Sequence, residues 1–255
     1  MIKINNYLKN LNRIEFVITS DCTGCCKHCS QGDHRYTGNF IDPEAASELV
    51  TIVSSKYPIT SVMTFGGEPL MHPESVCAIH SAATKAGIIK RQLITNGYFT
   101  KDIYKIKDVV KKIKLSGVND LLLSADAFHQ ETIPLDIVKI FASYVLDEGI
   151  NIRLNPAWLV DRQHSNLYND KTRIILNELV NLGVIESYGN NIFPEGNAKR
   201  NFSEYFDKNK EYINPYEESP YDIRSISIEP DGAIFGQNIY EKNIGEILSD
   251  YRPQI

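Results

Sequence analysis

The chain has 255 residues, of which 42% are hydrophobic and 23% charged, and this composition is typical of a globular protein with one sizeable core. Lys and Arg total 27 against 32 Asp and Glu, and the sequence contains neither a basic run nor an apolar stretch of the ~18–20 residues that span a membrane. These features argue against a nucleic-acid or membrane partner. Because there are only five cysteines and no apolar signal segment at the amino-terminal end, we expect a cytoplasmic location.

Short apolar segments alternate with longer segments of helical periodicity along the first two thirds of the chain. Strands are predicted at 14–19, 61–65, 91–95, 120–124, 150–154 and within 184–193, with helices at about 43–56, 73–86, 101–114, 135–148 and 171–182. Repeated strand–helix units of this spacing predict an α/β protein with a parallel sheet and helices outside it. Six units rather than eight predict an incomplete, TIM-like (β/α)6 barrel that is open on one side.

The pattern changes after Gly196. A strand is predicted at 225–228, Asp231-Gly232 is a strong hairpin turn, the chain returns at 233–235, and a short helix follows at about 243–248. We interpret residues 1–199 as the partial barrel and residues 200–255 as a short hairpin-plus-helix appendage.

Four cysteines lie within eight residues directly after the first predicted strand. Cys22, Cys26 and Cys29 have the spacing C-x-x-x-C-x-x-C, with Cys25 as an additional thiol. A disulfide knot is disfavoured by the low cysteine content, and a closed zinc site needs a fourth ligand, for which His28 and Cys25 are candidates. Three thiolates can also hold a [4Fe–4S] cluster that keeps one iron open to an outside ligand.

Further motifs follow the other predicted strands, where the carboxyl ends of parallel strands collect functional residues. Each motif could instead have a purely structural role, because Gly and Asn favour turns and buried charged side chains form ion pairs. The candidates, in strand order, are Gly66-Gly67-Glu68-Pro69, Asn96, Ser124 and Asp126, Asn155, and Glu195. His129 is either a proton carrier or an ordinary residue of the next helix, and Arg153 either binds a carboxylate or forms a structural ion pair.

The cysteine spacing, together with Gly-Gly-Glu one strand later, resembles the radical S-adenosylmethionine (radical SAM) superfamily over roughly residues 14–199. The resemblance implies that Cys22, Cys26 and Cys29 bind one [4Fe–4S] cluster whose open iron is chelated by S-adenosylmethionine. It implies an enzyme that cleaves this cofactor reductively and uses a 5′-deoxyadenosyl radical to remove a hydrogen atom from a substrate. An electron donor such as flavodoxin or ferredoxin is then expected as a partner.

The resemblance also assigns the strand-end residues to S-adenosylmethionine. Gly66 and Gly67 would let the backbone approach it, Glu68 would lie near its ammonium group, and the other contacts implied are Pro69, Asn96, Ser124, Asp126, Asn155, Glu195 and His28. The sequence departs from the family at His28, because the residue before the third cysteine is usually aromatic, and at the extra Cys25. Cys77, alone in a predicted helix, is expected to be an inert buried thiol.

The segment 226–245 resembles the start of the SPASM or twitch extension of peptide-modifying relatives. In those enzymes cysteines after the hairpin bind auxiliary clusters, but 233–255 contains no cysteine, so we expect a single cluster. The extension favours a ribosomally made peptide as substrate, modified by crosslinking, epimerisation or oxidation, although no leader-recognition domain precedes the first strand. Two alternatives stay open: a small-molecule substrate in antibiotic or cofactor biosynthesis, and a non-enzymatic iron–sulfur sensor or scaffold.

Overall fold

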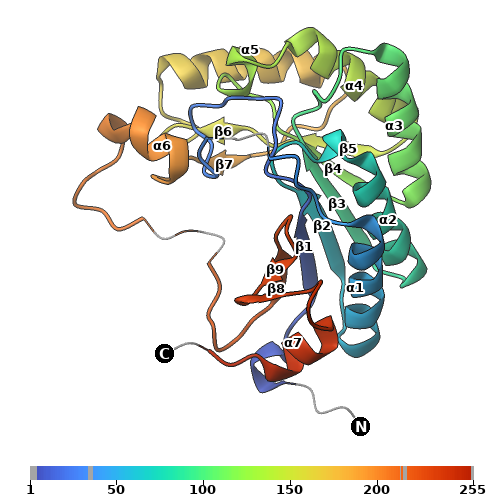
Figure 1. Cartoon of the computed structure of the whole chain (residues 1–255). Coiled ribbons are helices and arrows are strands. Elements are labelled where there is room, and N and C mark those ends of the chain that lie inside the picture. The colour runs from blue at the N-terminus through green and yellow to red at the C-terminus, as the bar shows by residue number, and fades with distance from the viewer. Residues whose placement is uncertain (1–4, 34–36, 213, 215–216, 254–255) are drawn as a thin grey trace.

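The computed structural model describes residues 5–33, 37–212, 214 and 217–253. Its centre is a parallel sheet of six strands, which confirms the predicted α/β architecture (Figure 1). In spatial order the strands are β5 (Asn151–Leu154), β4 (Asp120–Leu123), β3 (Lys90–Thr95), β2 (Ser61–Phe65), β1 (Arg13–Val17) and β8 (Ser225–Ile228).

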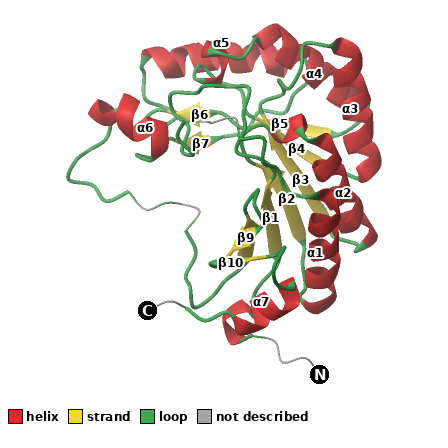
Figure 2. Ribbon diagram, viewed as in Figure 1, coloured by secondary structure: helices red, strands yellow, loops and turns green. Residues whose placement is uncertain are grey.

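Helices cover one face of this sheet (Figure 2). They are α1 (Pro43–Lys56), α2 (Pro73–Lys85), α3 (Ile103–Ser116) and α4 (Leu135–Asp147), and α5 (Leu167–Asn181) follows further along the chain. Local signals explain their ends: Asp42 accepts a hydrogen bond from the Ala45 amide at the start of α1, and Gly117, with φ of 98°, ends α3. Within the described part of the chain, no helix has the length and apolar character needed to cross a bilayer.

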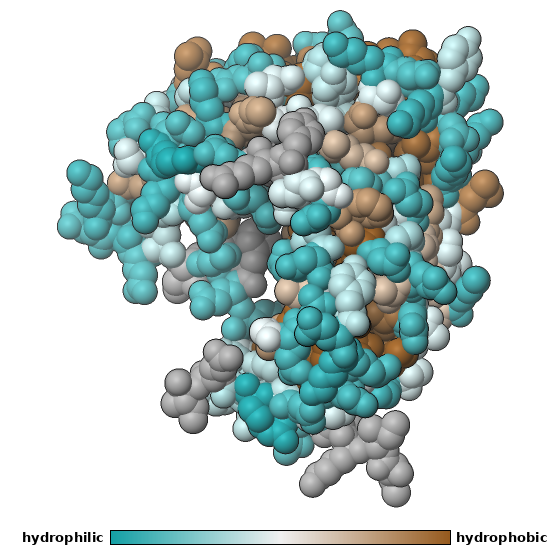
Figure 3. Space-filling model, viewed as in Figure 1, coloured by the Kyte–Doolittle hydropathy of each residue, from teal (hydrophilic) through white to brown (hydrophobic). Residues whose placement is uncertain are grey.

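Alternating side chains give the sheet two different faces. Ile14 and Phe16 of β1 are fully buried on the helix-covered face, whereas Arg13 and Glu15, which alternate with them in sequence, are only half-buried. We call the face that carries Arg13 and Glu15 the inner face. It turns toward the side of the molecule that lacks helices α1–α4, where the surface is indented and its rim mostly hydrophilic (Figures 1 and 3).

The sixth strand of the sheet differs from the prediction. The segment 184–193 contributes only β7 (Asn190–Asn191), which pairs in parallel with β6 (Ala157–Trp158) in a separate two-stranded sheet. Ile185 makes a single bridge to Arg153 of β5, so this segment only touches the edge of the main sheet. A run of polar residues, Glu186 to Asn191, does not provide the apolar alternation that a buried barrel strand needs.

The carboxyl-terminal strand β8 takes a place in the main sheet instead, where it pairs in parallel with β1. A turn does form at Asp231-Gly232, but the antiparallel ladder joins β9 (Ala233–Ile234) to β10 (Gln237–Asn238) around Phe235 and Gly236, both of which have positive φ. Helix α7 (Ile244–Asp250) then lies beside α1. The hairpin and helix are therefore present, with the ladder one turn later than predicted, and the division of the chain at 199 and 200 stays a prediction.

Candidate active site

The cysteine loop connects β1 to α1 at the carboxyl end of the sheet. Cys22 and Cys26 are buried, Cys29 is half-buried and Cys25 is exposed. The amide of Cys25 donates to Thr132 Oγ1 at 3.1 Å, which ties the loop to the segment after β4. Burial raises the pKa of the Cys22 thiol to about 12 and raises that of Cys26 as well. Both thiols are therefore neutral until a metal ion replaces their protons.

The two glycines after β2 are required by the close approach of this turn to the end of β1. A Cβ atom on Gly66 would lie 2.5 Å from the Thr19 carbonyl oxygen, and one on Gly67 would lie 2.0 Å from that of Asp21. The Gly67 amide donates to Thr19 O at 2.7 Å, and the Glu68 amide donates to Asp21 O at 2.8 Å. The glycine pair thus fixes the turn against the start of the cysteine loop.

Glu68 is completely buried, and its carboxylate already has three protein donors. Oε1 accepts from Thr95 Oγ1 at 2.7 Å and from the Leu70 amide, and Oε2 accepts from the Asn96 amide at 2.9 Å. Burial raises the pKa of this carboxyl to about 7, against the opposing effect of these hydrogen bonds. Pro69, also buried, begins a 3₁₀ turn directly after it.

Asn96, at the end of β3, reaches the cysteine loop. Its Nδ2 lies 3.7 Å from Cys22 Sγ and 3.3 Å from Thr23 Oγ1, and only 5% of the residue is exposed. Glu68, Asn96 and Cys22 therefore lie together, as the resemblance predicted.

Asp126, after β4, is fully buried and organises the neighbouring segment. Its Oδ1 accepts from the amides of Phe128 and His129 at 3.0 Å and lies 2.9 Å from His129 Nδ1, while Oδ2 accepts from the Ala157 amide. Burial alone would raise the pKa of Asp126, but the adjacent His129 outweighs this and lowers it well below its usual range. Asp126 thus fixes the His129 ring and the neighbouring backbone amides by hydrogen bonds. The His129 ring in turn lies against His28 of the cysteine loop.

His28 lies in the same place. Its ring centroid is 4.8 Å from that of His129 and 4.9 Å from that of Phe128, and its Nδ1 is buried without a hydrogen-bond partner among the described residues. Burial lowers the pKa of His28 to about 4, so the imidazole is neutral at physiological pH.

The three remaining predicted residues make few contacts with this group. Ser124 is half-buried at the end of β4. Asn155 is half-buried and accepts a hydrogen bond from Asn190 Nδ2 through Oδ1 at 3.3 Å. Glu195 is the exposed residue before α6 (Gly196–Asn201), and its side chain makes no cap hydrogen bond.

Asn197 is a site residue that the sequence did not single out. Its backbone amide donates to Cys29 O at 2.8 Å, and its Nδ2 donates to Cys26 O at 3.2 Å and to Gly32 O at 3.1 Å. A Cβ on the preceding Gly196 would lie 2.5 Å from Cys29 O, so glycine is needed for this approach. Its only sequence signal was its place two residues after Glu195, which the resemblance assigns to S-adenosylmethionine.

A second group of buried side chains borders the site and is called the small aromatic cluster. Its buried members are Phe128, Leu159, Ile192, Ala198 and Phe202. Tyr168 adds a ring that stacks on Phe128 with centroids 4.8 Å apart. Because Phe128 also contacts His28, this cluster shields one side of the cysteine loop.

Charged and polar side chains form a connected network on the inner face of the sheet. Arg13 Nε lies 2.5 Å from Glu15 Oε1, and Arg13 Nη1 donates to Gln92 Oε1. Gln92 Nε2 donates to Asp120 Oδ2 at 2.7 Å, and Arg153 binds the Asp120 carboxylate with two nitrogens at 2.9 and 3.1 Å. Of the two roles considered for Arg153, the structure therefore shows the ion pair. We call these five residues the inner-face network.

Comparison with known proteins adds sequence evidence. Residues 16–148 match the family model of the radical SAM superfamily. The chain is 27% identical over 220 residues to a probable GTP 3′,8-cyclase from Saccharolobus islandicus, an alignment that covers 82% of this chain and 67% of the relative.

Solved structures add evidence on the fold. SuiB from Streptococcus suis bound to its precursor peptide SuiA superposes with a TM-score of 0.62 and 14% identity, over 96% of this chain and 66% of SuiB. The same enzyme bound to S-adenosylmethionine gives a TM-score of 0.57 with 15% identity, over 95% of this chain. This chain thus spans about two thirds of the length of SuiB, and the likeness extends beyond the segment that the family model covers.

The family match, the partial barrel and the three-cysteine loop agree with one another, and they decide against a non-enzymatic sensor or scaffold. The expected cofactors, a [4Fe–4S] cluster and S-adenosylmethionine, are those of the family. The chain belongs to the radical SAM superfamily and is an S-adenosylmethionine-dependent iron–sulfur enzyme.

Proposed function

We propose that Cys22, Cys26 and Cys29 hold the cluster. In support, Cys25 is exposed, whereas the buried Cys22 lies against Asn96 at the end of β3 and the buried Cys26 lies near His129 after β4. Three thiolates bind three of the four irons of the cluster and leave the fourth iron open, which is the iron that S-adenosylmethionine chelates in this superfamily.

The ligand set is tested by replacing each cysteine with alanine and measuring iron and sulfide after anaerobic reconstitution. Cys22→Ala, Cys26→Ala and Cys29→Ala should each lose the cluster, whereas Cys25→Ala and Cys77→Ala should retain about four irons per chain. A cubane signal in Cys26→Ala would refute the assignment of the ligands. A second cluster's worth of iron in the unaltered chain would refute the expectation of a single cluster.

We infer that S-adenosylmethionine is held between the ends of β2, β3 and β4. Glu68 supplies negative charge toward the ammonium group, Asn96 supplies an amide, and His28, which packs on the buried Phe128, supplies a flat surface for the adenine. Ser124, Asp126, Asn155 and Glu195 line the other strand ends as further candidates, with Asp126 acting through His129.

The cofactors together supply the chemistry that cleaves S-adenosylmethionine to a 5′-deoxyadenosyl radical, which removes a hydrogen atom from the substrate. The chain positions the reactants and shields them from water, and the small aromatic cluster is well placed for that shielding. A one-electron donor such as flavodoxin or ferredoxin is needed, and a cytoplasmic location would keep the thiols reduced.

We propose a peptide as the substrate, on the basis of the inner-face network. Both of its arginines are already neutralised, Arg13 by Glu15 and Arg153 by Asp120, so the network offers donors and acceptors but no net positive charge. A peptide with amide groups and charges of both signs matches such a surface. A triphosphate would need cations without partners, which this network does not provide. The overall likeness to SuiB, which was solved with a precursor peptide, supports the same choice.

A small molecule is the second candidate, because the curated relative is a probable GTP 3′,8-cyclase. The neighbouring genes are first searched for one that encodes a short precursor peptide. The two substrates are then distinguished by incubating the reconstituted enzyme, with a reductant and S-adenosylmethionine, with either GTP or that peptide. We expect the peptide to increase 5′-deoxyadenosine formation and to change in mass, and GTP to do neither. Consumption of GTP with a matching rise in 5′-deoxyadenosine would replace the peptide proposal by the nucleotide one.

A further inference from the structure

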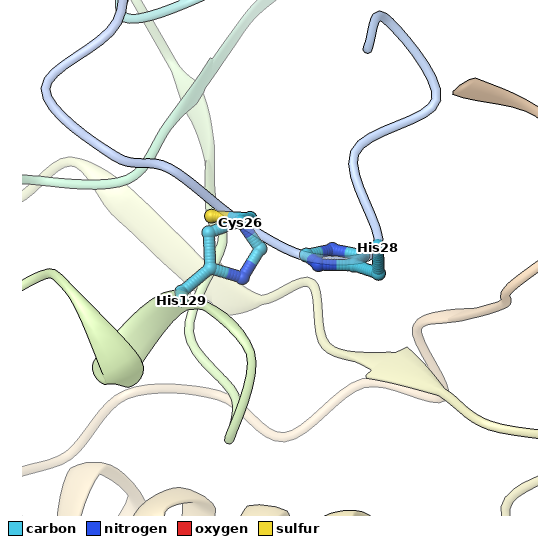
Figure 4. A group of neighbouring side chains, drawn as sticks. All are labelled: Cys26, His28 and His129. Carbon is cyan, nitrogen blue, oxygen red and sulfur yellow. The ribbon is translucent and has the colours of Figure 1, made fainter. Parts of the chain in front are cut away.

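Three potential metal ligands of different types lie together beside the cysteine loop. One ligand atom from each of Cys26, His28 and His129 can be chosen so that all three lie within 4.8 Å of one another. Figure 4 shows the sulfur of Cys26 beside the two imidazole rings. Cys26 and His28 come from the loop after β1, and His129 begins the 3₁₀ turn His129–Glu131 after β4.

The His129 ring has the orientation of a metal ligand. Its Nδ1 lies 2.9 Å from Asp126 Oδ1, and Asp126 is itself fixed by the amides of Phe128 and Ala157. This leaves Nε2 as the free nitrogen. Metal-binding histidines almost always donate their other ring N–H to such a carboxylate or carbonyl, which sets the tautomer and makes the ligand more basic.

The His28 ring provides a second, independent indication. Its Nδ1 is buried and has no hydrogen-bond partner in the described part of the chain. Buried polar atoms normally have a partner, and one left unsatisfied destabilises the fold. The rings of Phe128 and His129 pack against His28 on two sides and hold it in place.

We propose that the chain without its cluster binds one Zn²⁺ ion through Cys26 Sγ, His28 and His129 Nε2, with Asp126 orienting His129. Mixed sulfur and imidazole donors suit Zn²⁺, and three protein ligands leave one position for water. Binding replaces the Cys26 thiol proton, which is released to solvent. If Cys26 is also a cluster ligand, zinc and cluster exclude each other. This mutual exclusion depends on the proposal that Cys26 is a cluster ligand. The zinc site itself does not depend on that proposal.

Co²⁺, which reports on zinc sites by its absorption, tests the ligand set on the full chain stripped of iron. We expect one Co²⁺ per chain with a sulfur-to-cobalt charge-transfer band. His129→Ala, His28→Phe and Cys26→Ser should each abolish this band, and Asp126→Asn should weaken binding about 10- to 100-fold. Cys29→Ser and Cys25→Ser are the matched controls and should leave the titration unchanged.

The rival site uses only the three loop thiolates and makes the opposite prediction. If Cys29→Ser abolishes cobalt binding while His129→Ala does not, the proposed site is wrong. Circular dichroism shows whether each variant is folded. If His129→Ala does not fold, the His28→Phe variant is used to test the ligand set instead.

A second experiment tests the exclusion. The chain preloaded with one equivalent of Zn²⁺ should fail to assemble the cluster, and a chelator should restore assembly. The His129→Ala variant should assemble it with or without zinc. Assembly at an unchanged rate in the zinc-loaded chain, with zinc retained, would overturn the exclusion but leave the cobalt result standing.

Discussion

The large core occupies the helix-covered face of the sheet, whereas the small aromatic cluster borders the cysteine loop. Fully buried aliphatic residues such as Val62, Leu93 and Leu121 dominate the large core, which takes in every strand of the main sheet. The small aromatic cluster has five buried members and continues into the half-buried rings of His28 and Tyr168. The difference indicates that the scaffold is stabilised mainly by apolar packing, while the site depends on a few polar contacts.

The largest effect is expected in the large core. Phe141→Ala removes a fully buried ring that packs against Phe99 and Gly97, and should lower the free energy of unfolding by about 3–5 kcal/mol in urea titrations. The iron content per folded chain should not change. The matched control is Leu115→Ala on α3, which is 86% exposed and should change stability by less than about 0.5 kcal/mol.

Glu68 lies where the scaffold meets the site, and its substitution should affect binding more than folding. Glu68→Gln removes a charged acceptor for the S-adenosylmethionine ammonium, so affinity measured by calorimetry should fall about 10- to 100-fold, equivalent to roughly 1.5–3 kcal/mol. Thr95→Val is the control, since it removes a donor to Glu68 Oε1 and the acceptor of the Gly97 amide but leaves the Glu68 carboxylate in place. If Thr95→Val weakens binding equally, Glu68 acts by holding its turn rather than by contacting the cofactor.

Asn197 tests the dependence of the site on polar contacts. Asn197→Ala leaves the carbonyls of Cys26 and Gly32 without their side-chain donor, at a cost of about 1–3 kcal/mol, and iron should be lost to a chelator faster than from the unaltered protein. Asn201→Ala, which removes one exposed bond to Lys27 O, should have little effect. Equal iron loss from both variants would contradict a specific role for Asn197.

The smallest effect per pH unit concerns His80, a fully buried histidine of α2. Burial, helped by the nearby Arg91, lowers the pKa of His80 to about 3, and its Nε2 lies 3.0 Å from Thr64 Oγ1. Between pH 6.5 and about 3 the unfolded chain binds a proton at this residue and the folded chain does not. Stability should therefore fall as the pH decreases, by about 1.4 kcal/mol per unit. His80→Gln should remove this part of the slope in urea titrations at a series of pH values, and an unchanged slope would contradict the assignment.

The sequence predicted those features that depend on local patterns. Helix α1 begins and ends at the predicted residues, because Asp42, Pro43 and the apolar periodicity are all local signals. The position of β8 was not predictable in this way, since an alternating strand such as 225–228 is equally compatible with a hairpin and with a sheet edge. Its choice of β1 as partner is a tertiary contact.

The same limit applies to the site. The spacing of Cys22, Cys26 and Cys29 indicated a metal centre, because ligands in one loop are necessarily close. The contacts of Asn197 with Cys26 O and Gly32 O join segments about 170 residues apart, and no local pattern specifies them. The inner-face network was likewise only partly anticipated, through Arg153.

The pairing of β1 with β8 has a consequence for synthesis on the ribosome. Arg13 pairs with Ser225, about 200 residues later in the chain, so one edge of β1 has no partner until these residues have also emerged. Unpaired strand edges are templates for pairing with other chains, and domains generally fold as units during synthesis. The nascent chain is thus expected to expose this edge for many seconds, which makes it a natural binding site for a chaperone during translation.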